Sequence, residues 1–315
     1  MSGTVKNTQK TKSKLFSVIV FLIILLILFL ILELIARLVV GNRLIVKVEP
    51  DGLFQFKPNQ YGWYSYMLRI PHARINNIGA RGEDINLSTI NETRKFIFLG
   101  DSFTFGWERK ENETIPSYFQ KEFSDSVSIN YGNGGFGIEH MISSYNFHKN
   151  LFNSGTVIMI IIEDDFYRHL VPYSGSFLKE TFWKIKEKSS AIAWIWAAVT
   201  GTIDQIKNKN RSNPHGLDVF NTSGEMLVKF NQQVKNENKT LLLVFYEYND
   251  TNYSNYAGNF CQRNGLRCIT DVPYSMHLVS ESGYPVFSED KGHPSEYANE
   301  AVAQRITKYV YNLGN

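Results

Sequence analysis

The chain has 315 residues, of which 43% are hydrophobic and 20% are charged, with 22 Gly and 9 Pro. This composition excludes a disordered or collagen-like chain, and 2 cysteines are too few for a disulfide-rich scaffold or a four-thiolate zinc site. The formal net charge is +3, but four lysines precede residue 15, so the remainder carries about −1. Proteins that follow phosphate backbones need a strongly basic surface, so we expect no nucleic acid partner.

The N-terminal region contains a long apolar segment, in which every residue from 18 to 32 is apolar. With its flanks, the segment 15–40 is long enough, at ~1.5 Å per helical residue, to cross the ~30 Å hydrocarbon core of a bilayer. The alternative is a cleaved signal peptide, but its apolar region is usually about 7–15 residues long and ends at a small-x-small site, which is missing here. We therefore expect a single retained transmembrane helix over 15–40. The lysines of the tail 1–14 favour a cytoplasmic N-terminus, which places the rest of the chain outside the cytoplasm.

Cys261 and Cys268 flank a short Asn-Gly turn. Two alternatives remain open for this pair, a disulfide in an oxidising compartment or two buried free thiols. Neither cysteine lies in a motif that indicates catalysis.

After the apolar segment, residues 41–93 contain turn formers and aromatics without a sustained period, which predicts an irregular lead-in. From residue 94 onward, short apolar runs alternate with helical stretches. Buried strands are predicted at 95–99, 127–130, 156–162, 241–246 and 266–270, and helices at 115–123, 138–151 and 294–311. Apolar strands separated by helices predict a mostly parallel sheet covered on both faces, which is a three-layer α/β/α domain over 94–315.

Residues 166–215 interrupt this alternation with an excess of basic over acidic residues and three tryptophans. The apolar run 191–199 is too short to span a bilayer. The simpler interpretation is a helical lid that covers one edge of the domain, and the other is a lid that rests on anionic lipid headgroups. The sequence favours the first, because interfacial helices usually show a cleaner amphipathic stripe.

Four chemically suggestive elements follow predicted strands or precede the last helix. A Gly-Asp-Ser sequence with Ser102 follows the first strand, although helix capping alone would explain it. A glycine-rich loop with Gly132 follows the second strand, where a backbone N–H can approach a substrate oxygen. Asp164 follows the third strand, and Asp290 with His293 precedes the last helix as a potential acid and base for a serine nucleophile. Because parallel strands end at the same edge of a sheet, we expect these elements to converge there.

Together these elements resemble the SGNH, or GDSL, hydrolase family. In that family a Gly-Asp-Ser block carries the nucleophile, matching Ser102, and an Asn-x-Gly-x-x-Gly block gives an oxyanion-hole N–H, matching Gly132. An Asp-x-x-His block supplies the orienting acid and the base, matching Asp290 and His293. Upstream, Asn76-x-x-Gly79-x-Arg81-Gly82 looks like the lead-in of a membrane-anchored, envelope-associated branch. The resemblance implies the flavodoxin-like SGNH fold.

The sequence departs from the family at one position. The family's third block is Gly-x-Asn-Asp, with the Asn side chain as an oxyanion donor, and Asp164 occupies the matching position here. A carboxylate only accepts hydrogen bonds unless it is protonated, and losing one such donor costs on the order of 10²–10³ in rate in the studied case. Three alternatives stay open: burial keeps Asp164 neutral, another donor replaces the Asn, or the protein is slow or inactive.

The sequence therefore predicts a membrane-anchored, extracytoplasmic serine esterase that uses Ser102, His293 and Asp290, with the N–H groups of Ser102 and Gly132 as oxyanion donors. The resemblance implies an acylated envelope carbohydrate as substrate, most simply an O-acetyl ester. The alternatives are an O-acyltransferase with the same triad and a non-catalytic glycan-binding or assembly protein. No cofactor is expected, and no metal, because the acids near residue 164 match no metal-binding spacing.

Overall fold

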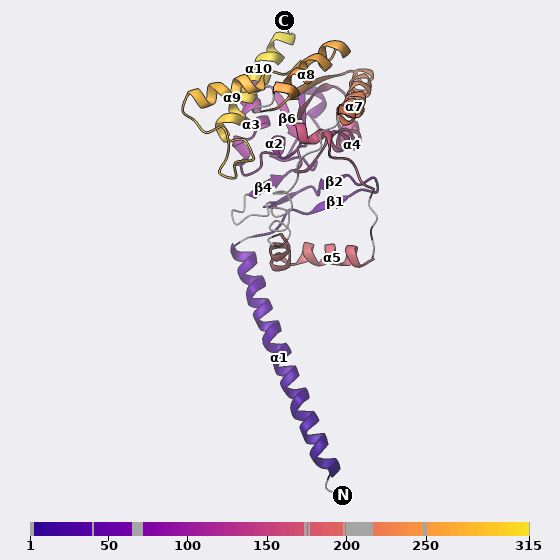
Figure 1. Ribbon diagram of the computed structural model, residues 1–315, viewed down its shortest axis with the longest axis vertical. Coiled ribbons are helices and arrows are strands. Elements are labelled where there is room, and N and C mark those ends of the chain that lie inside the picture. The colour runs from indigo at the N-terminus through magenta and orange to yellow at the C-terminus, as the bar shows by residue number, and fades with distance from the viewer. Residues whose placement is uncertain are drawn as a thin grey trace.

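The computed structural model describes residues 3–39, 41–64, 72–172, 175, 177–197, 199, 217–247 and 251–314. Helix α1 (Gly3–Val39) projects from a domain of packed sheets and helices, with the two chain termini at opposite ends of the molecule (Figure 1). Its segment Phe16–Val39 is long and apolar enough to cross a membrane, and its most apolar part is 0% buried in the protein. A signal sequence near an N-terminus has the same length and composition.

The domain is built on a parallel sheet of β5 (Arg94–Leu99), β6 (Ser126–Asn130), β7 (Gly155–Ile161), β8 (Lys239–Phe245) and β9 (Cys268–Ile269). The spatial order is β6-β5-β7-β8-β9. Counted in chain order within this sheet, the order is 2-1-3-4-5, which is the flavodoxin-like arrangement. The predicted fold class is therefore confirmed, and the five strands lie within a few residues of their predicted positions.

Helices cover both faces of this sheet. One face packs against α4 (Ile138–His148), α7 (Leu217–Asn236) and α8 (Thr251–Asn264), and the other against α3 (Ile115–Glu122), α9 (Val272–Glu281) and α10 (Glu296–Gly314). Successive side chains of a strand point to opposite faces. Thus Ile97 and Leu99 of β5 enter the first core, while Phe96 and Phe98 enter the second.

The lead-in is more regular than the sequence predicts. It contains two antiparallel hairpins, β1 (Val46–Val48) with β2 (Phe54–Phe56) and β3 (Gln60–Trp63) with β4 (His72–Ile75). Strands of three or four residues are too short to establish a detectable sequence period, which explains the difference. The lead-in is also part of the domain, since the N–H of Arg81 donates to the carbonyl of Asn130 at the end of β6 at 2.9 Å.

The basic insertion is helical where the structure describes it, as α5 (Phe177–Lys188) and a helix over 190–197. Residues 200–216 of the predicted lid lie outside the described residues. The helices lie beside the domain end of α1 (Figure 1), and α5 contacts the lead-in through an ion pair between Glu187 and Lys57. The edge that they cover is thus formed by α1 and the lead-in.

Cys261 of α8 and Cys268 of β9 form a disulfide, which decides between the two alternatives for this pair. It fastens the last strand of the sheet to the helix that precedes it.

Candidate active site

Ser102 lies at the carboxyl end of β5, as the sequence predicts. The strand ends at Leu99, and the short helix α2 (Ser102–Phe105) begins after a two-residue turn. The turn is tight, because a Cβ at Gly100 would lie 2.0 Å from the hydroxyl of Thr104. Asp101 caps α2 by accepting the N–H of Phe103 at 2.9 Å. The Gly-Asp-Ser sequence thus serves both to cap a helix and to present Ser102 at the sheet edge.

The structure brings Ser102, His293 and Asp290 together, although Ser102 and His293 are 191 residues apart in the chain. The Oγ of Ser102 lies 3.0 Å from Nε2 of His293, and Nδ1 of His293 is hydrogen-bonded to the carboxylate of Asp290. The imidazole stacks on Trp107 at a centroid distance of 5.6 Å and meets the edge of Phe103. These aromatic rings restrict the orientation of the imidazole.

Asp290 is held as a carboxylate by its surroundings. Burial would raise its pKa, but hydrogen bonds from the His293 ring, Ser288 and the N–H groups of Gly292 and His293 outweigh burial and hold the pKa well below its usual range. Lys291 adopts a left-handed conformation with φ of 57°, which folds the loop around the acid. Since a carboxylate can only accept, Nδ1 of His293 carries the proton and Nε2 is left to accept from Ser102.

Gly132 is close to α2, which begins at Ser102, but its N–H already has an acceptor. The group donates to Oδ1 of Asn130 at 3.0 Å, and an added Cβ would lie 2.3 Å from the backbone nitrogen of Phe105. In this geometry the N–H of Gly132, the predicted oxyanion donor, is engaged by the side chain of Asn130. The residue is glycine because the loop after β6 packs directly on the backbone of α2.

The second glycine of the same sequence block, Gly135, fits that role better. It has a φ of +83°, no atom lies within 4 Å of where its Cβ would be, and its N–H donates to no acceptor among the described residues. Its neighbours approach the site on both sides. A Cβ at Gly134 would lie 3.0 Å from the ring of Trp107, and the carbonyl of Phe136 accepts from Arg168 at 3.2 Å. The Asn-x-Gly-x-x-Gly spacing could have indicated Gly135 as a second candidate donor, because the block contains both glycines.

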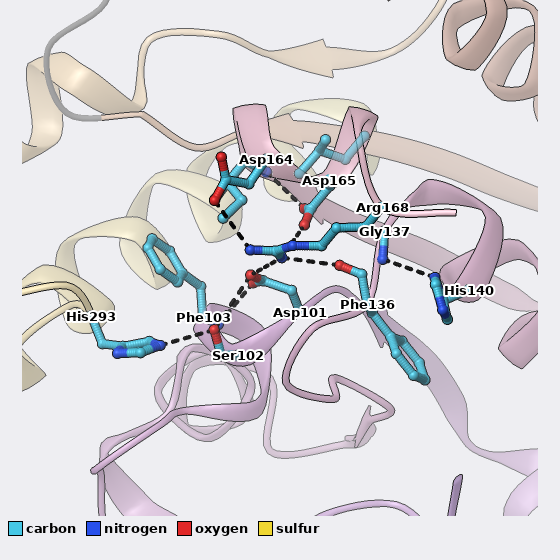
Figure 2. Close-up of polar contacts among 12 residues, drawn as sticks. Asp101, Ser102, Phe103, Phe136, Gly137, His140, Asp164, Asp165, Arg168 and His293 are labelled. Carbon is cyan, nitrogen blue, oxygen red and sulfur yellow. Dashed lines mark hydrogen bonds and ion pairs between the residues drawn. The ribbon is translucent and has the colours of Figure 1, made fainter. Parts of the chain in front are cut away.

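Asp164 lies at the surface, 56% exposed, and accepts a hydrogen bond from Nη2 of Arg168 at 3.3 Å (Figure 2). Burial therefore does not keep this side chain neutral, which removes the first of the three alternatives. The neighbouring acid, Asp165, is fully buried and accepts the N–H of Ile162 at 2.9 Å. The loop after β7 thus directs the second of its two aspartates, not the first, into the protein.

Arg168 is the residue of this site that the sequence analysis missed. Its Nη1 donates to Oδ1 of Asp165 at 2.9 Å and to Oδ2 of Asp101 at 3.0 Å, and Asp101 Oδ2 also lies 3.3 Å from the hydroxyl of Ser102 (Figure 2). Burial, and then the charge of Asp101, raise the pKa of Asp165. Burial would lower the pKa of Arg168, but the carboxylates of Asp165 and Asp101 outweigh it and raise that pKa. The guanidinium of Arg168 therefore lies one hydrogen-bonded residue away from Ser102.

Arg81 explains the upstream Asn-x-x-Gly-x-Arg-Gly sequence in physical terms. Its buried guanidinium donates to the carbonyls of Phe105 and Gly106 at 2.7 Å each and of Arg109 at 2.6 Å. Asn76 shapes the preceding turn by accepting the N–H groups of Ile78 and Ala80. The lead-in therefore fixes the chain just beyond α2.

Within the described part of the chain, no three His, Cys, Asp or Glu side chains are grouped as a metal site. His169, which lies near the acidic loop, is hydrogen-bonded to Glu139 at 2.9 Å.

No protein-family model and no curated protein matches the chain. Solved structures that resemble it include a member of the lipolytic protein G-D-S-L family from Veillonella parvula, with 12% identity over 69% of this chain and 97% of that chain and a TM-score of 0.44. Esterase EstA from Pseudoalteromonas has 11% identity over 70% of this chain and 100% of its own, with a TM-score of 0.45. A mutant of the acetylxylan esterase Axe2 from Geobacillus stearothermophilus has 15% identity over 70% and 96%, with a TM-score of 0.43. At such low identity, function has to be inferred from the site itself.

Proposed function

We propose that this protein is a serine esterase in which Ser102 is the nucleophile, His293 the base and Asp290 the acid that orients the base. The observation that carries the proposal is the 3.0 Å separation between Ser102 Oγ and His293 Nε2, with Asp290 on the other ring nitrogen. The hydroxyl oxygen attacks the ester carbonyl carbon while its proton passes to Nε2. That proton then goes to the departing alkoxide, and a water deprotonated by His293 releases the acid from the acyl-enzyme.

We propose the N–H groups of Ser102 and Gly135 as the donors to the tetrahedral oxyanion. Among the described residues neither N–H has a protein acceptor, whereas the N–H of Gly132 is bound to Asn130. Backbone donors fixed in place before the reaction stabilise developing charge without reorganisation. Asp164 has no part in this step.

Arg168 acts as a positioning residue in this proposal. The buried carboxylate of Asp101 would oppose an oxyanion on the neighbouring Ser102, and it would compete with His293 for the serine hydroxyl. The hydrogen bond from Arg168 to Asp101 Oδ2 neutralises this carboxylate and occupies the same oxygen. The serine proton is then directed to His293, whose nitrogen is also the closer acceptor.

The test combines turnover with chemical labelling. We expect the full chain to hydrolyse p-nitrophenyl acetate and to react with a fluorophosphonate probe, and Ser102→Ala to lose both without a change in circular dichroism. Ser143→Ala is the matched control, since that hydroxyl contacts Asp51 away from the triad. Equal labelling of Ser102→Ala and the parent chain would reject the assignment.

We further propose that α1 remains attached as a membrane anchor, with the N-terminus in the cytoplasm and the domain outside. Glu33, inside the apolar helix, accepts hydrogen bonds from Ser189, Ser190 and Ala191 of the domain, an arrangement unsuited to a segment that is removed. The disulfide suits an oxidising compartment. Intact-mass measurement of the membrane fraction tests the anchor, because cleavage would remove the first three dozen or so residues.

For the substrate we propose an O-acylated carbohydrate of the envelope, with acetyl as the acyl group, because an anchored enzyme meets esters held close to the membrane. Transfer to a sugar hydroxyl would proceed through the same acyl-enzyme, and products formed from a labelled acyl donor with and without oligosaccharide separate transfer from hydrolysis. The non-catalytic alternative depended on Asp164, and the hydrogen-bonded Ser102–His293–Asp290 series favours the enzyme.

A further inference from the structure

Two helices of the basic insertion, α5 and residues 190–197, are fastened to the domain end of α1; we call them the insertion helices. The carboxylate of Glu33 accepts the Ser189 hydroxyl at 2.7 Å and the N–H groups of Ser190 and Ala191 at 3.1 and 3.0 Å. Arg37 donates to the carbonyl of Lys188 at 2.7 Å. These hydrogen bonds therefore fix the position of the insertion helices along the axis of α1.

One face of the 190–197 helix packs on the lead-in. Ala193 and Ala197 are buried against Trp63, and the Ser190 hydroxyl donates to the carbonyl of Gly41 at 3.2 Å. On α5, Glu187 pairs with Lys57 at 3.3 Å. These contacts fix which side of the helices turns toward the domain and which side turns away from it.

The side that turns away is apolar and exposed. Ile195 is 44% and Val199 49% exposed, Trp196 is 42% exposed while its ring also meets Phe182 of α5, and no charged residue occurs from 190 to 199. The apolar surface of α1 continues to this level, since Leu34 and Leu38 are also exposed. On a soluble domain such a contiguous apolar surface signals an interaction site.

The level of these helices corresponds to a membrane surface. Counting ~1.5 Å per residue from Phe16, the ~30 Å hydrocarbon core ends after about 20 residues, near Ile35. Glu33 and Arg37, which hold the insertion helices, lie on either side of that point. In Figure 1, α5 lies to one side of the domain end of α1 and runs across the direction of α1 rather than along it, as a helix lying in the plane of a bilayer would.

Building on the proposed anchor, we propose that the insertion helices dock on the outer surface of the bilayer. Ile195, Trp196 and Val199 enter the boundary between headgroups and acyl chains, where tryptophan is favoured and buried apolar area drives binding. The exposed Lys184 and Lys188 of α5 lie among anionic headgroups. We therefore favour the interpretation in which this insertion rests on lipid headgroups over the one in which it is only a lid. The contacts with Glu33 and Arg37 fix the position of the helices along α1, which the sequence did not show.

The test places a spin label at single cysteines in the full chain, reconstituted in vesicles of phosphatidylcholine and phosphatidylglycerol. Both native cysteines are paired in the disulfide, so Ile195→Cys and Val199→Cys can each be labelled selectively. Leu28→Cys in the apolar helix reports on the anchor, and Leu278→Cys on the exposed side of α9 is the matched aqueous control. Each label is measured for its accessibility to oxygen, which concentrates in lipid, and to a water-soluble nickel complex.

We expect labels at 195 and 199 to have an oxygen-to-nickel accessibility ratio several-fold above that at 278. A ratio equal to that at 278, while the label at 28 is lipid-exposed, would reject docking and leave the anchor in place. Low accessibility to both reagents at 195 and 199 would also reject docking, since it indicates that protein covers the surface. A water-exposed label at 28 would overturn the anchor itself, and the docking with it.

Discussion

Replacement of Asp290 by Asn changes the one group that fixes the proton on His293. The carboxylate accepts four hydrogen bonds, from the ring and backbone of His293, from Ser288 and from the N–H of Gly292. An amide oxygen can keep the two backbone bonds, but its NH₂ group then faces Nδ1 of the imidazole. Nδ1 must become an acceptor, which moves the ring proton to Nε2, where it blocks uptake of the serine proton.

The expected loss is large because tautomer and charge change together. The equivalent substitution in a well-studied serine protease lowers kcat by about 10⁴, and we expect a similar factor here, which corresponds to about 5 kcal/mol of transition-state stabilisation. KM should change little, since Asp290 lies behind the imidazole. The assay is steady-state hydrolysis of p-nitrophenyl acetate, with urea unfolding to verify that the variant is folded.

Asp271→Asn is the matched control, because it makes the same chemical change at a half-exposed carboxylate that pairs with Arg305 outside the site. It should retain full activity. In a Ser102→Ala background, Asp290→Asn should cost little further, since residues that act as a unit are not additive. A folded Asp290→Asn with a less than about tenfold loss would refute the assigned role of the acid.

Three further outcomes follow from individual contacts. Gly132→Ala should lower the free energy of unfolding in urea by at least about 1–3 kcal/mol and reduce activity, because its Cβ would meet the backbone of α2. Gly135→Ala should lower it by only about 1 kcal/mol, because its Cβ would enter open space and only the φ of +83° is unfavourable. Arg168→Met should lose stability toward the lower end of about 3–5 kcal/mol at pH 7, with Arg168→Lys losing less, because two buried carboxylates lose their cation. The stability deficit of the Met variant should shrink on acidification to pH 5, since burial raises the pKa of Asp165 and protonation removes its charge, and a deficit independent of pH would contradict this account. Burial lowers the pKa of His148 from 6.5 to about 4, so the parent chain should lose about 3 kcal/mol of stability as pH falls from 6.5 to about 4, with no further loss from this group below that. His148→Gln should flatten that part of the urea-midpoint profile, and unchanged curvature would contradict the assignment.

The parallel sheet could be predicted because its strands are buried on both faces and appear as uninterrupted apolar runs, as in Phe96–Leu99. The positions of Ser102, Asp290 and His293 could be predicted because parallel strands end at a common edge. Each of these inferences uses local sequence together with one general rule of α/β domains.

The contacts that the sequence did not reveal are local at Gly132 and join distant segments at Arg168 and Glu33. The N–H of Gly132 is taken up by the side chain of Asn130, which no composition rule foresees. Arg168 reaches Asp101 across 67 residues, and Glu33 reaches Ser189 across 156. Hydrogen-bond partners at such separations follow from the completed fold rather than from local pattern.

The hydrogen bonds of Arg81 also determine where the folded unit begins. Its guanidinium donates to three carbonyls at and just beyond the end of α2, and its backbone joins β6, so removal of residues 41–93 would take away these hydrogen bonds close to Ser102. A shortened version for crystallisation therefore has to start close to residue 41. A version that starts at residue 94, where the parallel sheet begins, would lack the hydrogen bonds from Arg81 that hold the chain close to Ser102 in place.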